Sequence, residues 1–173
     1  MKKTIILALI CTMVFSACKK QQSAAAPEAR KSMVSAELQT AFDVYKKINK
    51  AQKDYFEKNR TYATAFKQLN IDIPGGKVRE CSNVSKNDDY QQCIRTDKYE
   101  FYVRGTQNIK YTTYFKSLDG SILMSGYGSP QIKDAPITCA APDADNGNIC
   151  EALGGTRDTS MDMANFKAYN IAL

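Results

Sequence analysis

Six cysteines are the side chains of this 173-residue chain best suited to covalent chemistry, and the chain contains no histidine. Without histidine there is no imidazole general base, no histidine ligand for zinc and no imidazole ligand for haem. The serines lack a G-x-S-x-G context, and the glycine pairs at 75–76 and 154–155 lie outside any phosphate-binding pattern. The sequence therefore predicts a protein that is not an enzyme and has no cofactor.

Residues 1–17 have the order of a secretory signal peptide. Lys2 and Lys3 precede a short apolar run over residues 4–14, which ends in small residues. That run is too short to cross a bilayer, since a spanning helix needs roughly 20 apolar residues. We expect residues 1–17 to be removed on export, and Cys11 to be lost with them.

Cys18 follows directly after Ser16 and Ala17, and this junction resembles the lipobox of bacterial lipoproteins. In those proteins the cysteine is diacylated, for example with palmitate, and becomes the new N-terminus. The resemblance implies a lipoprotein that contacts the membrane through Cys18 and lies in the cell envelope. Lys19 rather than Asp comes next, which resembles the sorting pattern for the outer membrane. We therefore expect the outer membrane, facing the periplasm or the cell surface, rather than the inner membrane.

Four cysteines remain in the mature chain, and an even number in an exported protein is typical of disulfides. Of the three possible pairings we expect Cys81–Cys93 and Cys139–Cys150, because each pair brackets one polar loop. Closing a loop of about a dozen residues stabilises a fold by roughly 3 kcal/mol in the chain-entropy model. Neither pair has the C-x-x-C spacing of redox proteins, and export disfavours the reduced thiolates that zinc requires. The sequence predicts structural disulfides and no metal site.

One weak calcium pattern stays open as an alternative. Asp143, Asp145 and the polar residues after them resemble the start of a calcium loop. Gly154, however, stands at the twelfth position, where an EF-hand needs a bidentate acid. The sequence does not decide whether a calcium ion lies near Asp143 and Asp145.

Changes in composition divide the chain into three segments. Residues 1–17 are the signal peptide, and residues 18–32 are the lipidated cysteine with a polar tether interrupted by proline. Residues 33–173 have the length of one globular domain. The net charge of +6 includes the two signal-peptide lysines. The mature chain is therefore only mildly basic, and we expect no nucleic-acid partner.

Apolar residues recur at spacings of three and four from Met33 to about Lys58 and predict an amphipathic helix. Lysines occupy mainly its other flanks, so we expect them to face solvent. A short helical turn with Thr64 as its N-cap is predicted to follow and to end before Pro74. The apolar face of the long helix comprises Val34, Leu38, Phe42, Tyr45, Ile48 and Tyr55.

Three later segments alternate apolar and polar residues and predict β-strands over residues 99–103, 109–116 and 121–125. Asp119 and Gly120 predict a tight hairpin turn between the last two. These strands would form an antiparallel meander with one apolar face to cover the helix. The remainder from Gly128 contains three prolines and is predicted to be irregular.

Residues 51–63, AQKDYFEKNRTYA, resemble the phrase at which the long helix ends in type IV pilins and pseudopilins, with Arg60 in place of the usual glycine. Cys150 and the following EALGG resemble the disulfide-closed C-terminal loop of pilin-like proteins. The resemblance implies an α+β, pilin-like fold. In that fold a long N-terminal helix packs on an antiparallel β-meander of three to four strands, and a disulfide closes the C-terminal loop.

The chain departs from the family at its start, where a lipoprotein signal and tether replace the apolar half of the pilin helix. The resemblance therefore implies a lipid-anchored module rather than a shaft subunit. Its expected role is that of a structural or accessory component linked to type IV pilus or type II secretion machinery, whose proteins are the implied partners.

An alternative is an envelope lipoprotein that binds a small ligand or a glycan without a pilus role. An exposed hydrophobic groove would favour the pilus-linked role, and a deep aromatic pocket would favour ligand binding. The tyrosines that could line a ligand surface are Tyr99, Tyr102, Tyr111, Tyr114 and Tyr127.

Overall fold

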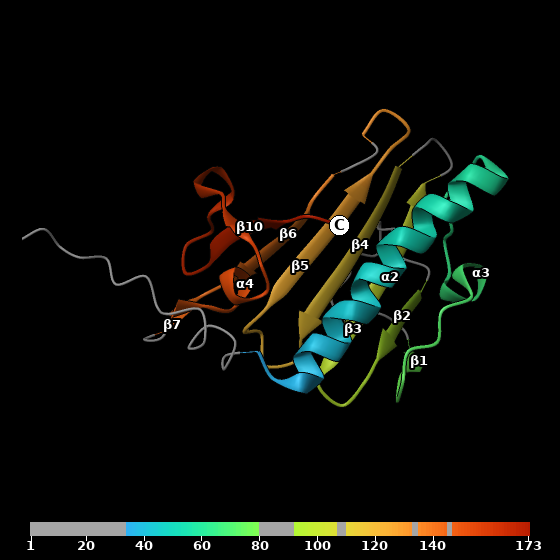
Figure 1. Cartoon of the computed structure of the whole chain (residues 1–173). Coiled ribbons are helices and arrows are strands. Elements are labelled where there is room, and N and C mark those ends of the chain that lie inside the picture. Colours follow the sequence, from blue (N-terminus) through green and yellow to red (C-terminus); the bar gives the residue numbers. More distant parts are fainter. Residues whose placement is uncertain (1–33, 80–91, 107–109, 133–134, 145–146) are drawn as a thin grey trace, which may run out of the picture.

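The computed structural model describes residues 34–79, 92–106, 110–132, 135–144 and 147–173. Its main feature is one large antiparallel sheet with the strand order β1-β2-β3-β4-β5-β6-β10-β9 (Figure 1). The strands are β1 Lys77–Arg79, β2 Gln92–Arg95, β3 Tyr99–Thr106, β4 Lys110–Ser117, β5 Leu123–Gly128, β6 Ile137–Ala141, β9 Thr156–Arg157 and β10 Lys167–Ile171.

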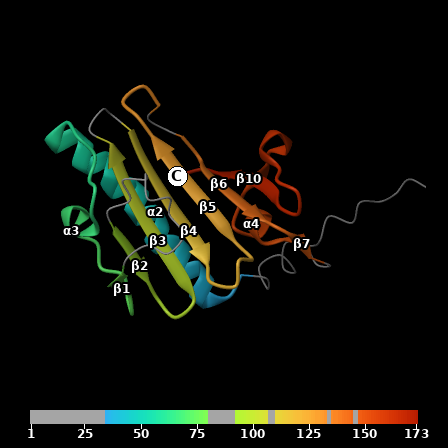
Figure 2. The ribbon, with the colours of Figure 1, turned by 180° about the vertical axis from the view of Figure 1, so that it is seen from behind.

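One long helix and several short elements accompany this sheet. The long helix α2 lies across one face of the sheet, and Figure 2 shows the sheet from the opposite side, with α2 behind the strands. The helices are α2 Ala36–Asn59, α3 Phe66–Leu69, α4 Ile149–Ala152 and the 3₁₀ helix η1 Thr159–Met161, and a separate hairpin joins β7 Asp143–Ala144 to β8 Gly147–Asn148.

The eight-stranded sheet corrects the expected fold class. A pilin-like fold with a long helix on a meander of three to four strands is wrong, because the sheet continues past the meander at both edges. The prolines after Gly128 suggested an irregular tail, but Pro136 and Pro142 flank β6 instead of interrupting it. The edge strands β1 and β9 have only three and two residues, which is too short to show an alternating pattern.

The helix α2 forms largely where its apolar periodicity predicts. Ser35 is its N-cap, since the Ser35 hydroxyl accepts a hydrogen bond from the Leu38 N–H at 3.0 Å, so the helix begins after Met33. Arg60 ends it in the left-handed region at φ 56°. The buried positions of the helix are Leu38, Ala41, Phe42, Val44, Tyr45, Ile48, Asn49 and Gln52.

Apolar and polar contacts together fix α2 on the middle of the sheet. The rings of Tyr45 and Phe115 lie 5.7 Å apart between their centroids. The Tyr45 hydroxyl donates to the Thr113 carbonyl oxygen at 3.0 Å, and the Thr113 hydroxyl donates to Asn49 Oδ1 at 2.7 Å. A Cβ on Gly126 of β5 would lie 2.0 Å from that Asn49 oxygen, so only glycine fits opposite the network.

The short helix α3 corrects the predicted N-cap. Its N-cap is Ala65 rather than Thr64. The Gln68 side chain turns back, and its Oε1 accepts hydrogen bonds from the backbone N–H groups of Thr64 at 2.8 Å and Ala65 at 2.9 Å. A glutamine at the third helical position therefore does the capping that the sequence assigned to the threonine.

Candidate functional site

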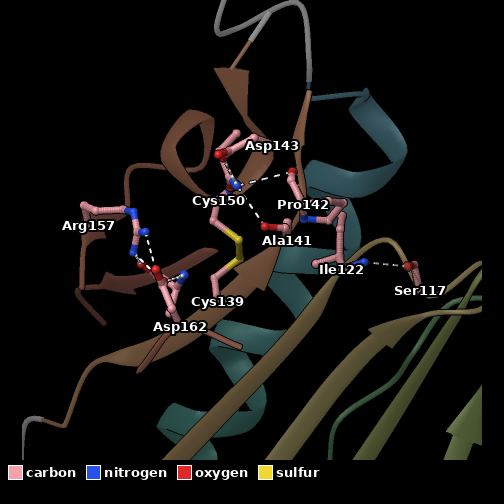
Figure 3. Close-up of a disulfide and its surroundings, with 11 residues drawn as sticks. Ser117, Ile122, Cys139, Ala141, Pro142, Asp143, Cys150, Arg157 and Asp162 are labelled. Atoms are coloured by element: carbon pink, nitrogen blue, oxygen red, sulfur yellow. Dashed lines mark hydrogen bonds and ion pairs between the residues drawn. A yellow bond between two sulfur atoms is a disulfide. The ribbon is translucent and has the colours of Figure 1, made fainter. Parts of the chain in front are cut away.

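The Cys139–Cys150 disulfide is present and fully buried (Figure 3). It joins the middle of β6 to α4, and the two Cα atoms lie 5.7 Å apart. Asn148 links α4 to the end of β6 beside the disulfide. Its Oδ1 accepts a hydrogen bond from the Cys150 N–H at 2.9 Å, and its amide donates to the Ala141 carbonyl at 2.9 Å. The predicted pairing of these two cysteines is confirmed.

The other predicted site cysteines lie partly outside the described residues. Cys93 on β2 is buried and disulfide-bonded. Cys81, its expected partner, lies outside the described residues, so the Cys81–Cys93 pairing stays a prediction. The lipidation site Cys18, with the signal peptide and tether, also lies outside them.

Of the two carboxylates in the possible calcium site, only that of Asp143 lies within the described residues. The Asp143 carboxylate accepts a hydrogen bond from the Asn148 amide at 3.1 Å, whereas Asp145 lies outside the described residues. Among the residues that the structure describes, no group of three or more His, Cys, Asp or Glu is arranged to hold a metal ion. In the same part of the chain, no helix is both long and apolar enough to span a membrane.

The five tyrosines do not form one surface. Tyr99 and Tyr102 on β3 are three residues apart, as are Tyr111 and Tyr114 on β4, so the members of each pair point to opposite faces of the sheet. The strand register places Tyr99 and Tyr111 on one face and Tyr102 and Tyr114 on the other. Tyr127 on β5 pairs with Thr112, which shares the face of Tyr114. The structure therefore separates the surface that the sequence suggested into two sets.

A different cluster forms where α2 ends. The ring centroids of Phe56 and Tyr62 lie 4.5 Å apart in a stacked arrangement, and those of Tyr62 and Tyr111 lie 5.0 Å apart at a tilt. These rings line a cavity of about 380 Å³. The turn after β5 also lines it, and in that turn the Ile132 N–H donates to the Ser129 carbonyl at 3.0 Å. This volume lies within the usual range for small-molecule sites, about 300–1,000 Å³.

The position of Tyr111 depends on glycine in both neighbouring strands. Gly105 of β3 and Gly128 of β5 are its direct register partners. A Cβ on Gly128 would lie 2.3 Å from the Tyr111 ring, and one on Gly105 would lie 2.7 Å from the Ala63 carbonyl oxygen. The tyrosine ring and the chain leaving α2 can therefore lie directly on the sheet backbone.

The Tyr111 hydroxyl is buried and has no hydrogen-bond partner among the described residues. Burial, followed by the nearby Tyr62, raises the pKa of Tyr111 above its ordinary value, so the hydroxyl keeps its proton and can donate. A buried polar group left unpaired costs about 1–3 kcal/mol. Because the hydroxyl has less than 1 Å² of accessible surface, this cost falls on the fold, and the hydroxyl is not an open contact for a ligand.

Charged side chains from the last turns of α2 surround the aromatic wall. Lys53 and Glu57 lie one turn apart on the helix, and Arg60 follows at its C-cap. Glu57 and Arg60 are exposed. The residues that line the cavity thus combine aromatic rings with charged side chains that donate and accept hydrogen bonds.

In two larger hollows, polar side chains are already paired with one another. One of about 670 Å³ runs along the solvent side of α2, where Lys46 pairs with Asp43 at 2.9 Å and Lys50 with Asp54 at 3.1 Å. The other, of about 540 Å³, lies beside the start of α2 and contains Asp119. The Asp119 carboxylate already accepts hydrogen bonds from the Ser121 backbone and hydroxyl.

Sequence reasoning named Tyr111 but missed Phe56, Arg60 and the turn after β5. Glycine inside a strand marks a close approach of other groups, but Gly105 and Gly128 lie beyond the predicted strands 99–103 and 121–125, so this signal was missed. Comparison of the chain with protein-family models, with curated proteins and with solved structures found no match.

Proposed function

We propose that this protein is a lipid-anchored protein of the cell envelope with a structural or accessory role linked to type IV pilus or type II secretion machinery. The anchor part of the proposal rests on the signal-peptide order and on Cys18 after Ser16-Ala17. The role rests on the pilin-like phrase at residues 51–63. The partners are proteins of that machinery, and the protein acts without catalysing a reaction.

One observation carries the pilus-linked role. Within the phrase, Gln52 Nε2 donates to the Ala63 carbonyl at 2.9 Å, and the Ala63 N–H donates to Gln52 Oε1 at 3.0 Å. Both residues are fully buried. The glutamine and the alanine of the phrase are therefore bonded to each other and fix how the chain leaves the helix, and this pairing is the observation that we take to support the role.

The eight-stranded sheet narrows the role. Because it differs from the small meander that the resemblance implied, we favour an accessory protein that contacts the machinery over a subunit that packs into a filament. A lipid at Cys18 would hold the domain at the membrane surface, where the machinery is assembled.

The test compares the intact protein with a matched anchorless variant in the bacterium that encodes it. A gene deletion is expected to reduce surface pili or secreted protein, and the wild-type gene is expected to restore them. Cys18→Ser should restore neither, because it removes the lipid. Cross-linking in envelope fractions should recover pilus or secretion proteins with the wild type only. Unchanged pili and secretion in the deletion strain would overturn the role.

A second candidate function is favoured by the aromatic-walled cavity at the end of α2. It is that of an envelope lipoprotein that binds a small ligand or a glycan, with no pilus role. The observation that favours it is the cavity of about 380 Å³ that Phe56, Tyr62 and Tyr111 help to line.

A further inference from the structure

The hollow of about 540 Å³ beside the start of α2 forms where two turns of the sheet and the C-terminal segment meet. The turn between β2 and β3 lies against the turn between β4 and β5, because the Leu118 N–H donates to the Lys98 carbonyl at 2.8 Å. Ile122, at the end of the second turn, and Ala141 and Pro142, at the end of β6, also line the hollow (Figure 3).

Apolar side chains that solvent can reach line this hollow. Tyr99, Leu118 and Ile149 are partly exposed, and Pro142 and Ala144 are exposed. An apolar side chain that enters the hollow would cover this surface and remove it from water, which is favourable. The volume lies within the range of sites that enclose a small molecule, about 300–1,000 Å³, so there is room for a side chain of a partner.

The charged side chains at the hollow leave a negative balance. Asp97 and Asp119 line it, and Glu37 pairs with Lys98, which is the one cation among the described lining residues. Hydrogen bonds within its turn, first from Ser117, lower the pKa of Asp119 to about 2, so this carboxylate stays charged. The start of α2 adds a positive charge of about half an elementary charge, which does not cancel three carboxylates against one ammonium group.

We propose that this hollow docks a basic segment of a pilus or secretion protein, in which an apolar side chain is flanked by Lys or Arg. The inference rests on the proposed pilus-linked role and names the surface through which it acts. The apolar side chain packs on Tyr99, Leu118 and Ile149, as the anchor residues of protein interfaces do. The basic side chains pair with Asp97 and Asp119, and this charge complementarity selects and orients the partner.

Binding is measured by NMR on the full lipidated chain in nanodiscs of phosphatidylcholine, a neutral lipid that does not attract basic peptides. The probe is a short peptide, glycine-lysine-leucine-lysine-glycine, with both ends blocked. One comparison peptide has glutamate in place of both lysines, and another has glycine in place of leucine. We expect the lysine-leucine-lysine peptide to shift the signals of Tyr99, Leu118 and Ile149. It should bind at least about tenfold more tightly than either comparison peptide.

Asp97→Lys reverses one charge at the hollow. Because Asp97 is exposed, the variant should keep its urea midpoint while it binds the lysine-leucine-lysine peptide about fivefold more weakly. Asp72→Lys is the matched control, since Asp72 is also exposed but does not line the hollow. In envelope fractions, Asp97→Lys should also lose the cross-links to pilus or secretion proteins that Asp72→Lys keeps.

The inference is overturned if the lysine-leucine-lysine peptide shifts no signal at the hollow or binds no better than a comparison peptide. Equal weakening by Asp97→Lys and Asp72→Lys would also overturn it. Binding that appears only after Arg30→Gln and Lys31→Gln would mean that residues of this chain before α2 occupy the hollow. Shifts at the hollow on raising the protein concentration without peptide would mean that a second copy does.

These outcomes are distinguishable from failure of the pilus-linked role. A protein that binds none of the peptides, in a strain whose pili or secretion still depend on the gene, would exclude this surface and leave the role in place. Unchanged pili and secretion in the deletion strain would exclude the role, whatever the peptides do.

Discussion

Buried polar side chains on α2 are paired, and the pairing decides which polar residues face the sheet. Asn49 accepts from the Thr113 hydroxyl, and Gln52 binds both backbone groups of Ala63. On the opposite face of the sheet Glu100 is also buried. Burial opposes its charge, but hydrogen bonds from Lys116 and Tyr102 hold the pKa of Glu100 below its ordinary value. The Tyr111 hydroxyl, by contrast, is buried without a hydrogen-bond partner among the described residues.

A prediction at this scale concerns Asp162. The Arg157 guanidinium and then the Ala168 N–H lower the pKa of Asp162 from 3.8 to about 2. The charged carboxylate therefore stabilises the fold above pH 3.8, and this contribution is lost as the pH falls through about 2. Arg157→Gln should move the NMR titration midpoint of the Asp162 carboxyl up toward 3.8.

Lys167→Gln is the matched control for that titration. Arg157 Nη2 lies 2.6 Å from the Asp162 carboxylate, whereas Lys167 Nζ lies 3.9 Å away. The lysine variant should therefore shift the midpoint less. An equal shift in the two variants would mean that long-range charge, and not the direct hydrogen bonds, sets the pKa of Asp162.

At the scale of elements, hydrophobic periodicity predicts long elements that bury one face. The helix α2 was readable because its apolar stripe repeats over 24 residues. The strand β5 was displaced: it begins at Leu123, because Ser121 is held in the turn by the Asp119 carboxylate. It also extends to Gly128, three residues beyond the predicted end at Ser125.

The cavity was not predictable from the sequence for a related reason. It joins the end of α2 to β4 and to the turn after β5, three places far apart in the chain. Phe56 has the spacing of a partly buried helix residue, and nothing local shows that it meets Tyr62 and Tyr111. Only the strand register, which places a glycine on each side of Tyr111, assembles the wall.

A prediction at the element scale tests the exit from α2. Gln52→Ala leaves both backbone groups of Ala63 buried and unpaired, so it should lower the free energy of unfolding by about 2–5 kcal/mol. Lys50→Ala is the control, since Lys50 pairs with Asp54 on an exposed flank of the same helix. It should change stability by no more than about 0.5 kcal/mol. The free energies of unfolding of both variants are measured in urea. Similar losses of stability in the two variants would contradict the role of Gln52.

At the scale of the whole molecule, the sheet forms one continuous layer from β1 to β9. The sequence predicted the central strands β3, β4 and β5 of that layer but not the strands beyond them. On the C-terminal side this is because β6 and β10 meet only through long-range pairing. Tyr169 on β10 lies opposite Cys139 on β6, so the Cys139–Cys150 disulfide sits within the sheet and not in an outlying loop. The C-terminal segment therefore contributes to the same core as α2.

If the C-terminal segment is part of that core, a proline in β10 must be costly. Ala168 is buried in β10 between β6 and β9, and its N–H donates to Asp162 at 3.0 Å. Ala168→Pro removes this donor from an inner strand and should lower the free energy of unfolding by on the order of 3 kcal/mol. Ala164→Pro makes the same substitution at an exposed turn position that accepts proline, and it should be nearly neutral in urea unfolding. A silent Ala168→Pro would mean that the sheet ends before β10, as the small meander first expected from the sequence would require.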